Sequence, residues 1–226
     1  MLAEARDGGC ALAVFPEMSL TGSVDPTQRP ERLIGLDHPA VAALTASTHD
    51  LGVAAVFGIA EAADHGVACI TQVFAQHGRF AGVQRKRHLG DDEIGYRADD
   101  ADVVFELDGL RFTIAICAEG ETDRPFAHAH SAGAALVCFS AAPGLWGRRT
   151  TEEEWRLGWE WWCGHGLRQA REHARERGLW IALAGQAGST DDEDFPGLAA
   201  LVDPRGEIVA QLPDWQAGNL VVDVPL

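Results

Sequence analysis

The sequence predicts an α/β protein in which mixed β-sheets are covered by helices in layers. Continuous apolar runs, such as residues 11–15 before Pro16, are typical of strands buried on both faces. Other strands are joined directly by tight turns, of which Asp108-Gly109 is the clearest hairpin signal. Strand–helix–strand units combined with such hairpins predict sheets that contain both parallel and antiparallel neighbours.

The first half of the chain shows these elements in order. A helical tail over residues 2–7 leads directly into the strand over 11–15. A helix is expected over 39–49, with Asp37 as its cap and one apolar face that contains Val41, Leu44 and Thr45. Strands are then expected over residues 53–60, 68–76, 79–84, 103–107 and 111–117, with hairpin turns at 77–78 and 108–109.

The second half alternates helices and strands. Thr151 begins a capping box and Gly178 ends the mostly helical stretch between them. Glycines inside that stretch are expected to break it into pieces, at Gly158, Gly164 and Gly166. A short helix is expected over 125–133, and strands over residues 136–140, 180–186, 198–202, 208–211 and 219–224.

The length of 226 residues predicts one domain over residues 1–226. The buried strand over 11–15 lies close to residue 1, and a buried strand needs a neighbour on each side. We therefore expect that an earlier strand and most of a helix are absent, so that the domain is short at its N-terminus.

Charge and hydropathy exclude several classes of partner. Asp and Glu number 34 against 18 Lys and Arg, which gives a formal net charge of -16 and repels nucleic acid and anionic lipid. The densest basic run, residues 85–88, is too short for a nucleic-acid groove. No run reaches the ~18 apolar residues of a membrane span, and the first residues lack a signal-peptide core. We expect a cytoplasmic protein.

The cysteines and histidines give little reason to expect a metal site. The five cysteines are an odd number without a Cys-x-x-Cys pair, which favours a reducing compartment and excludes a zinc ribbon. His128 and His130 have the spacing of two metal ligands on a strand, but their stretch reads as helix and no carboxylate completes the set. Tryptophans spaced along one helical face are expected to pack in the core or at a subunit interface, namely Trp155, Trp159 and Trp162.

Three residues that can carry chemistry stand at the ends of predicted strands. Cys117 ends one apolar strand, Glu17 follows a second and Lys86 follows a third. Lys86 is the only lysine beside 17 arginines, which favours a position that needs a compact ammonium. Each alone has an ordinary explanation: a buried core cysteine, a capping glutamate, or a lysine retained by chance. Together they supply a thiol, a base and a cation that stabilises developing charge.

These residues resemble the motifs of the nitrilase superfamily of carbon–nitrogen hydrolases. The family's glutamate, lysine, second-glutamate and cysteine motifs stand here in the family's order as Phe15-Pro16-Glu17-Met18-Ser19-Leu20-Thr21-Gly22, Arg85-Lys86-Arg87-His88-Leu89, Glu93-Ile94-Gly95-Tyr96-Arg97 and Ile114-Ala115-Ile116-Cys117. The family's last hairpin is matched by Asp194-Phe195-Pro196-Gly197 and Asp203-Pro204-Arg205-Gly206-Glu207. The similarity covers nearly the whole chain.

The resemblance implies a four-layer α-β-β-α sandwich, paired into a homodimer or a higher homo-oligomer. It implies that Cys117 attacks the carbon of an amide or nitrile and that Glu17 moves the proton. Lys86 and the backbone N–H of Ala118 would hold the oxyanion, and Glu93 would support them. No metal or organic cofactor is implied.

The stretch after the cysteine differs from that of related carbamoyl amino acid hydrolases, which use an arginine there to hold a substrate carboxylate. Glu119 and Glu121 stand there instead, so we expect substrate contacts that disfavour an anionic substrate. Alternatively, both side chains point to solvent, or Glu119 caps the helix that follows.

The expected activity is hydrolysis of a small non-peptide amide through a cysteine thioester, with release of ammonia or an amine. Nitrile hydrolysis by the same site is an alternative. A catalytically inactive family member that acts as a binding or assembly protein is another.

Overall fold

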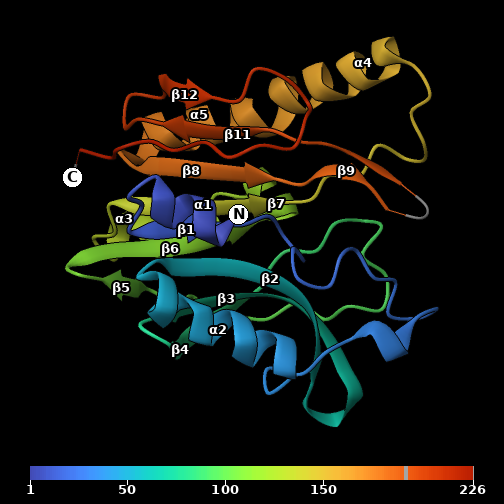
Figure 1. Ribbon diagram of the computed structural model, residues 1–226. Coiled ribbons are helices and arrows are strands. Elements are labelled where there is room, and N and C mark those ends of the chain that lie inside the picture. The colour runs from blue at the N-terminus through green and yellow to red at the C-terminus, as the bar shows by residue number, and fades with distance from the viewer. Residues whose placement is uncertain (191–192, 226) are drawn as a thin grey trace.

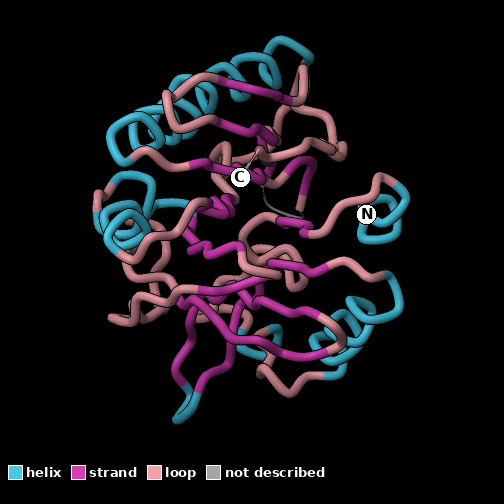
Figure 2. Tube along the Cα trace, turned by 90° about the vertical axis from the view of Figure 1, so that its left-hand side faces the viewer, coloured by secondary structure: helices cyan, strands magenta, loops and turns pink. Residues whose placement is uncertain are grey.

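The computed structural model describes residues 1–190 and 193–225. Within these residues the strands form two main sheets that face each other, and helices cover the outer face of each sheet (Figure 1, Figure 2). The expected mixed α/β sandwich is confirmed. No helix in this part of the chain is both long and apolar enough to cross a membrane.

The first sheet is built around the chain's N-terminal half. Its strands lie in the order β1 (Leu12–Val14), β2 (Ala54–Ala63), β3 (Val67–Gln76) and β4 (Arg79–Arg85). β1 runs parallel to β2, whereas β2, β3 and β4 are antiparallel neighbours. Its outer face carries the helices α1 (Leu2–Asp7) and α2 (Pro39–Leu51).

The second sheet holds most of the later strands. Their order is β12 (Ile208–Gln211), β11 (Ala199–Val202), β8 (Trp180–Gly185), β7 (Leu136–Ala141), β6 (Leu110–Ile116) and β5 (Phe105–Leu107). β6, β7 and β8 are parallel neighbours. β5 pairs antiparallel to β6, β11 pairs antiparallel to β8, and β12 pairs antiparallel to β11. A small hairpin joins β9 (Ala187–Ser189) to β10 (Asp194–Pro196).

The helices of the second half cover the outer face of the second sheet. They are α3 (Arg124–Ser131), α4 (Glu152–Trp162) and α5 (Arg168–Arg177), with a π-helical turn η4 (Cys163–Leu167) between the last two. Short 3₁₀ turns complete the described elements: η1 (Pro30–Arg32), η2 (Asp64–Gly66) and η3 (Cys117–Glu121).

Apolar side chains separate the four layers. Among the described residues, one cluster packs α1 and α2 on the first sheet and includes Leu2, Val41, Phe57 and Val73. A second fills the space between the sheets and includes Val56, Phe74, Phe112 and Ile114. A third packs α3 and α5 on the second sheet and includes Phe126, Val137, Ala170 and Ile181. Burial on both faces explains the continuous apolar runs of the strands.

Several local predictions are confirmed and others are wrong. Both predicted hairpin turns form, at His77-Gly78 and at Asp108-Gly109. Both residues of each turn have a positive φ. The Thr151 capping box also forms. The cap of α2 is His38 rather than Asp37. The residue before a proline is extended, and the His38 ring nitrogen accepts the Ala40 N–H at 3.2 Å.

The expected breaks in the long helical stretch are confirmed only in part: Gly158 does not interrupt α4, whereas Gly164 and Gly166 lie in η4, the π-helical turn between α4 and α5. A Cβ at Gly158 would lie 2.7 Å from the Leu145 side chain, and one at Gly166 would lie 2.4 Å from the Trp162 ring. These glycines therefore make room for neighbouring side chains, and α4, η4 and α5 follow one another without a gap.

Residues 219–224 are not a strand, contrary to the sequence pattern. The segment is rich in apolar residues, as strands are, but a strand forms only where a neighbouring strand supplies backbone hydrogen bonds. Among the described residues no strand pairs with it.

Candidate active site

The ends of β1, β4 and β6 place three side chains together. Glu17 lies three residues after β1, Lys86 follows β4 directly, and Cys117 follows β6 directly. The Glu17 and Lys86 residues are 1% and 0% exposed, whereas Cys117 is partly exposed. The three residues singled out in the sequence are therefore neighbours in space.

The Lys86 ammonium lies between two carboxylates. Its Nζ is 2.8 Å from Glu17 Oε1 and also donates to Glu93 Oε1. The other oxygen of Glu93 accepts the Gly90 N–H at 2.7 Å, which holds Glu93 in its own turn. The ammonium is thus held in one place by a buried carboxylate on one side and an anchored carboxylate on the other.

Cys117 lies in a strained backbone position at the start of η3. Its φ is +43°, which is in the left-handed region that residues other than glycine seldom adopt. Its thiol lies close enough to the Glu17 carboxylate for each group to change the pKa of the other, and the Ala142 backbone N–H lies near the sulfur. The next residue, Ala118, is in the first turn of η3, where backbone N–H groups have no partner within the helix.

Burial and charge shift the pKa values of these groups in definite directions. Burial raises the pKa of the Cys117 thiol well above its ordinary value, and the Glu17 carboxylate raises it further. Burial also raises the pKa of Glu17, against the opposing effect of Lys86. For Lys86, burial acts to lower the pKa, but Glu17, Cys117 and Glu93 outweigh it and raise the pKa. The site therefore holds a neutral thiol, an ammonium, and a carboxyl group that is a stronger base than usual.

The turn that carries Glu17 depends on a glycine in β2. A Cβ on Gly58 would lie 2.2 Å from the Met18 backbone nitrogen and 2.9 Å from the Glu17 carbonyl carbon. Met18 itself has a φ of +47°. From the second sheet, the Ser140 hydroxyl donates to the Phe15 carbonyl oxygen at 2.8 Å. Sequence reasoning missed Gly58, because its role depends on a contact between residues about forty positions apart in the chain.

A buried ion pair ties the lysine segment to the cysteine segment. Arg87, the residue after Lys86, donates from Nη2 to Glu119 Oε2 at 2.6 Å and from Nε to Oε1 at 2.9 Å. The Ile116 N–H donates to Glu119 Oε2 at 2.9 Å. The sequence analysis did not single out Arg87, although Arg87 belongs to the dense basic run over residues 85–88. Arg85 of the same run also forms a salt bridge within the protein, with Glu61.

The expected substrate contact of Glu119 is not what the structure shows. Glu119 is fully buried, and both its oxygens are occupied by Arg87 and by backbone. Glu119 does not cap the helix that follows either, because it lies inside η3 and its carboxylate accepts the N–H of Ile116 at the start of that same turn. Glu119 therefore shapes the loop after Cys117.

Glu121 lies at the other end of η3 and is exposed. Its Oε1 is 3.4 Å from His165 Nε2, and the His165 ring stacks on Trp161 with centroids 5.8 Å apart. Trp146 meets Trp161 edge to face at 5.2 Å. Glu121 is thus part of an exposed aromatic cluster outside the buried triad.

Only one of the helical tryptophans is fully in the core. Trp162 is buried, whereas Trp161 is 37% exposed and Trp146, in the loop before the helix, is 74% exposed. Exposed aromatic rings are typical of interfaces, so the pairing of two subunits through this face stays a prediction.

Tyr96 is a further residue at the site that sequence reasoning did not single out. Its hydroxyl donates to the Val24 carbonyl oxygen at 2.6 Å. Burial raises the pKa of Tyr96, and the carboxylates of Glu17 and Glu93 raise it further, so the phenol is neutral. The signal was present, because this is the chain's only tyrosine and it lies in the Glu93 motif.

His128 and His130 lie on α3 and not on a strand, so they do not form the spacing of strand ligands. The Nδ1 of His130 is 2.7 Å from the Arg177 carbonyl oxygen. Within residues 1–190 and 193–225, no three His, Cys, Asp or Glu side chains come together as metal ligands.

Comparison with known proteins places this geometry in a family. A family model described as carbon-nitrogen hydrolase matches residues 1–226. No curated protein sequence matches the chain. Among solved structures, the NitN amidase from Nesterenkonia sp. AN1 has a TM-score of 0.82 and 24% identity, covering 99% of this chain and 83% of that one.

Two further structures show the same fold. A variant of that amidase in complex with butyramide has a TM-score of 0.82 and 23% identity, covering 99% of this chain and 81% of that one. The glutamine-dependent NAD+ synthetase from Acinetobacter baumannii has a TM-score of 0.72 and 19% identity, covering 96% and 39%. These identities establish the fold, and the match of the family model over residues 1–226 establishes that the chain belongs to the carbon–nitrogen hydrolase family.

Proposed function

We propose that this protein hydrolyses the C–N bond of a small non-peptide amide through a thioester on Cys117. One observation carries the proposal: the buried Glu17 carboxylate accepts a hydrogen bond from the Lys86 ammonium and lies close to the Cys117 thiol. A base, a nucleophile and a cation held close together are the groups that acyl transfer to sulfur requires.

In the first half of the reaction, Glu17 takes the thiol proton while the sulfur attacks the amide carbon. The C=O π electrons move to oxygen, and the resulting oxyanion lies against the Lys86 ammonium and the Ala118 backbone N–H. Glu17 then gives its proton to the nitrogen. The C–N bond breaks, the amine or ammonia leaves, and a thioester remains.

In the second half, Glu17 removes a proton from a water molecule, and the resulting oxygen nucleophile attacks the thioester carbon. The oxyanion forms again at the same donors. Collapse of this intermediate breaks the C–S bond, and the thiolate recovers its proton from Glu17. Glu93 anchors the ammonium throughout, so that it need not reorganise between the steps.

The test is a panel of small amides, nitriles and carbamoyl compounds. We expect turnover of amides, loss of turnover in Cys117→Ala, and a mass increase equal to the acyl group on Cys117 when the reaction is quenched. A nitrile turned over in preference to its amide would favour the alternative reaction at the same site. A compound hydrolysed by Cys117→Ala at the wild-type rate would contradict the mechanism.

An inactive family member that serves as a binding protein is distinguished by the reactivity of its cysteines. A thiol that passes its proton to Glu17 as it reacts should be alkylated by iodoacetamide much faster than Cys138, which is buried without a base. Cys117→Ala and Glu17→Gln should each remove the fast phase. Equal slow labelling of all cysteines would support the inactive alternative.

A further inference from the structure

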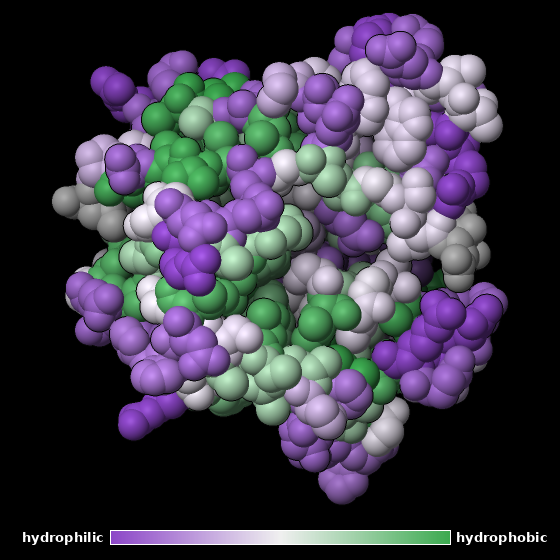
Figure 3. Space-filling view, in the orientation of Figure 1, coloured by the Kyte–Doolittle hydropathy of each residue, from purple (hydrophilic) through white to green (hydrophobic). Residues whose placement is uncertain are grey.

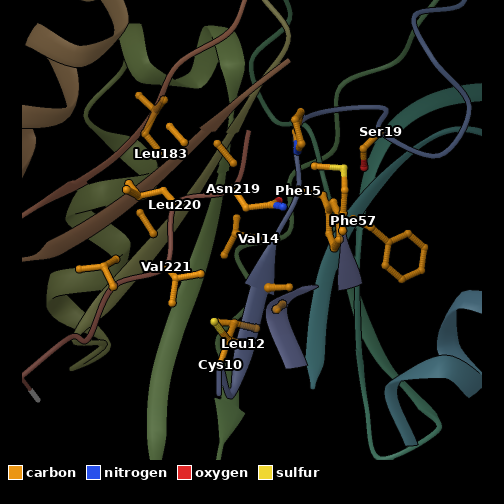
Figure 4. A pocket seen from close by; sticks show the side chains of 18 of the residues that line it. Cys10, Leu12, Val14, Phe15, Ser19, Phe57, Leu183, Asn219, Leu220 and Val221 are labelled. Carbon is orange, nitrogen blue, oxygen red and sulfur yellow. The ribbon is translucent and has the colours of Figure 1, made fainter. Parts of the chain in front are cut away.

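A large apolar groove of about 990 Å³ lies beside β1. Figure 4 shows Leu12 and Val14 of β1 on one wall and Leu183 of β8 on the other. Apolar residues also surround α1 on this face of the molecule (Figure 3). The groove reaches the segment around Glu17, but none of the described residues that line it belongs to η3. The turn that carries the nucleophile is therefore held in place by other parts of the molecule.

The nucleophile turn η3 is packed tightly between the second sheet and α5. A Cβ on Gly120 would lie 2.7 Å from the Phe139 ring of β7 and 2.9 Å from Gln169 Oε1 of α5. The same turn begins at Cys117, whose backbone is strained, and such strain persists only where the surrounding structure holds the backbone. Contacts from α5 are therefore part of what keeps Cys117 in place.

His173 of α5 makes a direct polar contact with this turn. Its Nε2 is 2.9 Å from the Gly120 carbonyl oxygen. A carbonyl oxygen can only accept, so Nε2 carries the hydrogen and donates it. Gly120 lies in the last turn of η3, where backbone carbonyls have no partner within the helix. His173 supplies that partner from a different element.

The imidazole ring of His173 is itself held by stacking. It lies nearly parallel to the buried Phe126 ring of α3, with an interplanar angle of 9° and centroids 3.8 Å apart. The second ring nitrogen, Nδ1, is buried and has no hydrogen-bond partner among the described residues. Within that part of the chain, the hydrogen bond to Gly120 is therefore the polar contact that fixes the direction of the ring.

We propose that His173 is a positioning residue for the amide hydrolysis proposed above. Its hydrogen bond fixes the Gly120 peptide, two residues after Ala118, and so keeps the Ala118 N–H where the oxyanion forms. This inference rests on the proposed function, because an oxyanion arises only if Cys117 attacks an acyl carbon. A displacement of about 1 Å at a reacting centre can cost about 10²-fold in rate, so loss of the hydrogen bond should lower kcat.

Two substitutions separate the donor from the ring. His173→Phe keeps an aromatic ring against Phe126 and removes the donor, whereas His173→Gln keeps an N–H donor and removes the ring. We expect His173→Phe to lower kcat by about tenfold or more and to change KM by less than about threefold, because the oxyanion donor acts in the transition state. His173→Gln should keep kcat within about threefold of that of the unmodified protein.

Melting temperatures distinguish this role from a merely structural one. His173→Gln loses the stacking on Phe126 and should melt about 2–4 °C lower than the unmodified protein. A merely structural role would make kcat follow the melting temperature, whereas we expect kcat to follow the donor. If His173→Phe does not fold, His173→Leu, which also lacks a donor and occupies less volume, replaces it in the comparison.

His130→Phe is the matched control. The Nδ1 of His130 is 2.7 Å from the Arg177 carbonyl oxygen, so this histidine makes the same kind of contact at a place outside η3. Because His130 is exposed and lies on α3, its substitution should keep kcat within about threefold.

Hydrogen exchange gives a readout that does not depend on activity. The Thr122 N–H donates to the Glu119 carbonyl oxygen at 3.1 Å, at the end of η3. Exchange at this amide should be faster by about fivefold or more in His173→Phe and close to that of the unmodified protein in His173→Gln. If the unmodified protein hydrolyses no compound of the panel, the proposed function fails, and the exchange at Thr122 alone decides whether His173 holds the turn.

Two results would overturn the proposal. The first is a folded His173→Phe variant in which kcat and the exchange at Thr122 both stay within about twofold of the unmodified protein. The second is a His173→Gln variant that loses as much kcat as His173→Phe, which would assign the effect to the ring and not to the hydrogen bond.

Discussion

At the scale of single residues, Lys86 is the side chain whose identity is most restricted. It is fully buried and its ammonium contacts both Glu17 and Glu93. A guanidinium is wider, planar and donates in fixed directions, so it cannot place one point charge between two carboxylates and an oxyanion. The chain uses arginine at its other 17 basic positions.

We expect Lys86→Arg to lower kcat by about 10²–10³, the usual effect of losing an oxyanion donor, while the circular dichroism spectrum stays that of the folded protein. Steady-state kinetics with the amide that is hydrolysed fastest measure kcat. A far-ultraviolet circular dichroism spectrum shows whether the variant is folded. Arg85→Lys is the matched control, since Arg85 pairs with Glu61 outside the triad, and it should keep activity within a few-fold. Activity of the same order in Lys86→Arg would show that the lone lysine is accidental.

The raised pKa of Glu17 determines the acid limb of the pH profile. The reaction needs the carboxylate form of Glu17, and burial raises its pKa above the ordinary value of about 4.3. As pH decreases, kcat/KM should therefore fall at a pH above about 4.3, because Glu17 becomes protonated there. Glu106→Gln, at the exposed position of β5, should leave the pH of this acid limb unchanged. An acid limb at or below the ordinary value would contradict the assigned base.

At the scale of elements, β2 and the Glu17 turn approach each other so closely that only glycine fits between them. We expect Gly58→Ala to destabilise the fold by about 1–3 kcal/mol and to lower kcat, because the added methyl group displaces the Met18 and Glu17 backbone. Denaturant unfolding and kinetics measure the two effects.

Gly164→Ala is the control for that substitution. No atom of the described residues lies within 4 Å of a Cβ at Gly164, so this variant should change the free energy of unfolding by no more than about 0.5 kcal/mol. If the two glycine variants were equally active and equally stable, the close approach of Gly58 to the Glu17 turn would not matter for stability or activity.

At the scale of the whole molecule, the net negative charge and the exposed Glu121 carboxylate both disfavour an anionic substrate. A net charge of -16 repels anions over the whole surface, and Glu121 adds a local carboxylate at the end of η3. We expect a neutral amide to be hydrolysed faster than its carboxylated analogue. Glu121→Gln should narrow that preference by about two- to fivefold at low ionic strength.

Competition between the two amides measures this preference directly. Glu31→Gln, in the exposed turn η1, removes the same charge from a different part of the chain. If it narrowed the preference as much as Glu121→Gln does, the effect would belong to the total charge and not to the loop after Cys117. A preference for the carboxylated amide that neither variant changes would contradict the charge argument.

The sequence by itself determined the parts of this protein that depend on local rules. Strand patterns that end just before Glu17, Lys86 and Cys117 identified both the strands and the residues that meet at their ends. The turn at Asp108-Gly109 and the capping box at Thr151 were readable because their physics lies within a few neighbouring residues.

Only the tertiary structure decided what depends on partners distant in the chain. Glu119 forms an ion pair with Arg87 across 32 positions and so does not face the substrate. Gly58 is required by a turn about forty residues earlier, and residues 219–224 have the sequence of a strand but pair with no strand among the described residues. A local pattern shows what a segment can become. Backbone pairing, close approach and charge compensation decide what it becomes, because each needs a second group that only packing brings within reach.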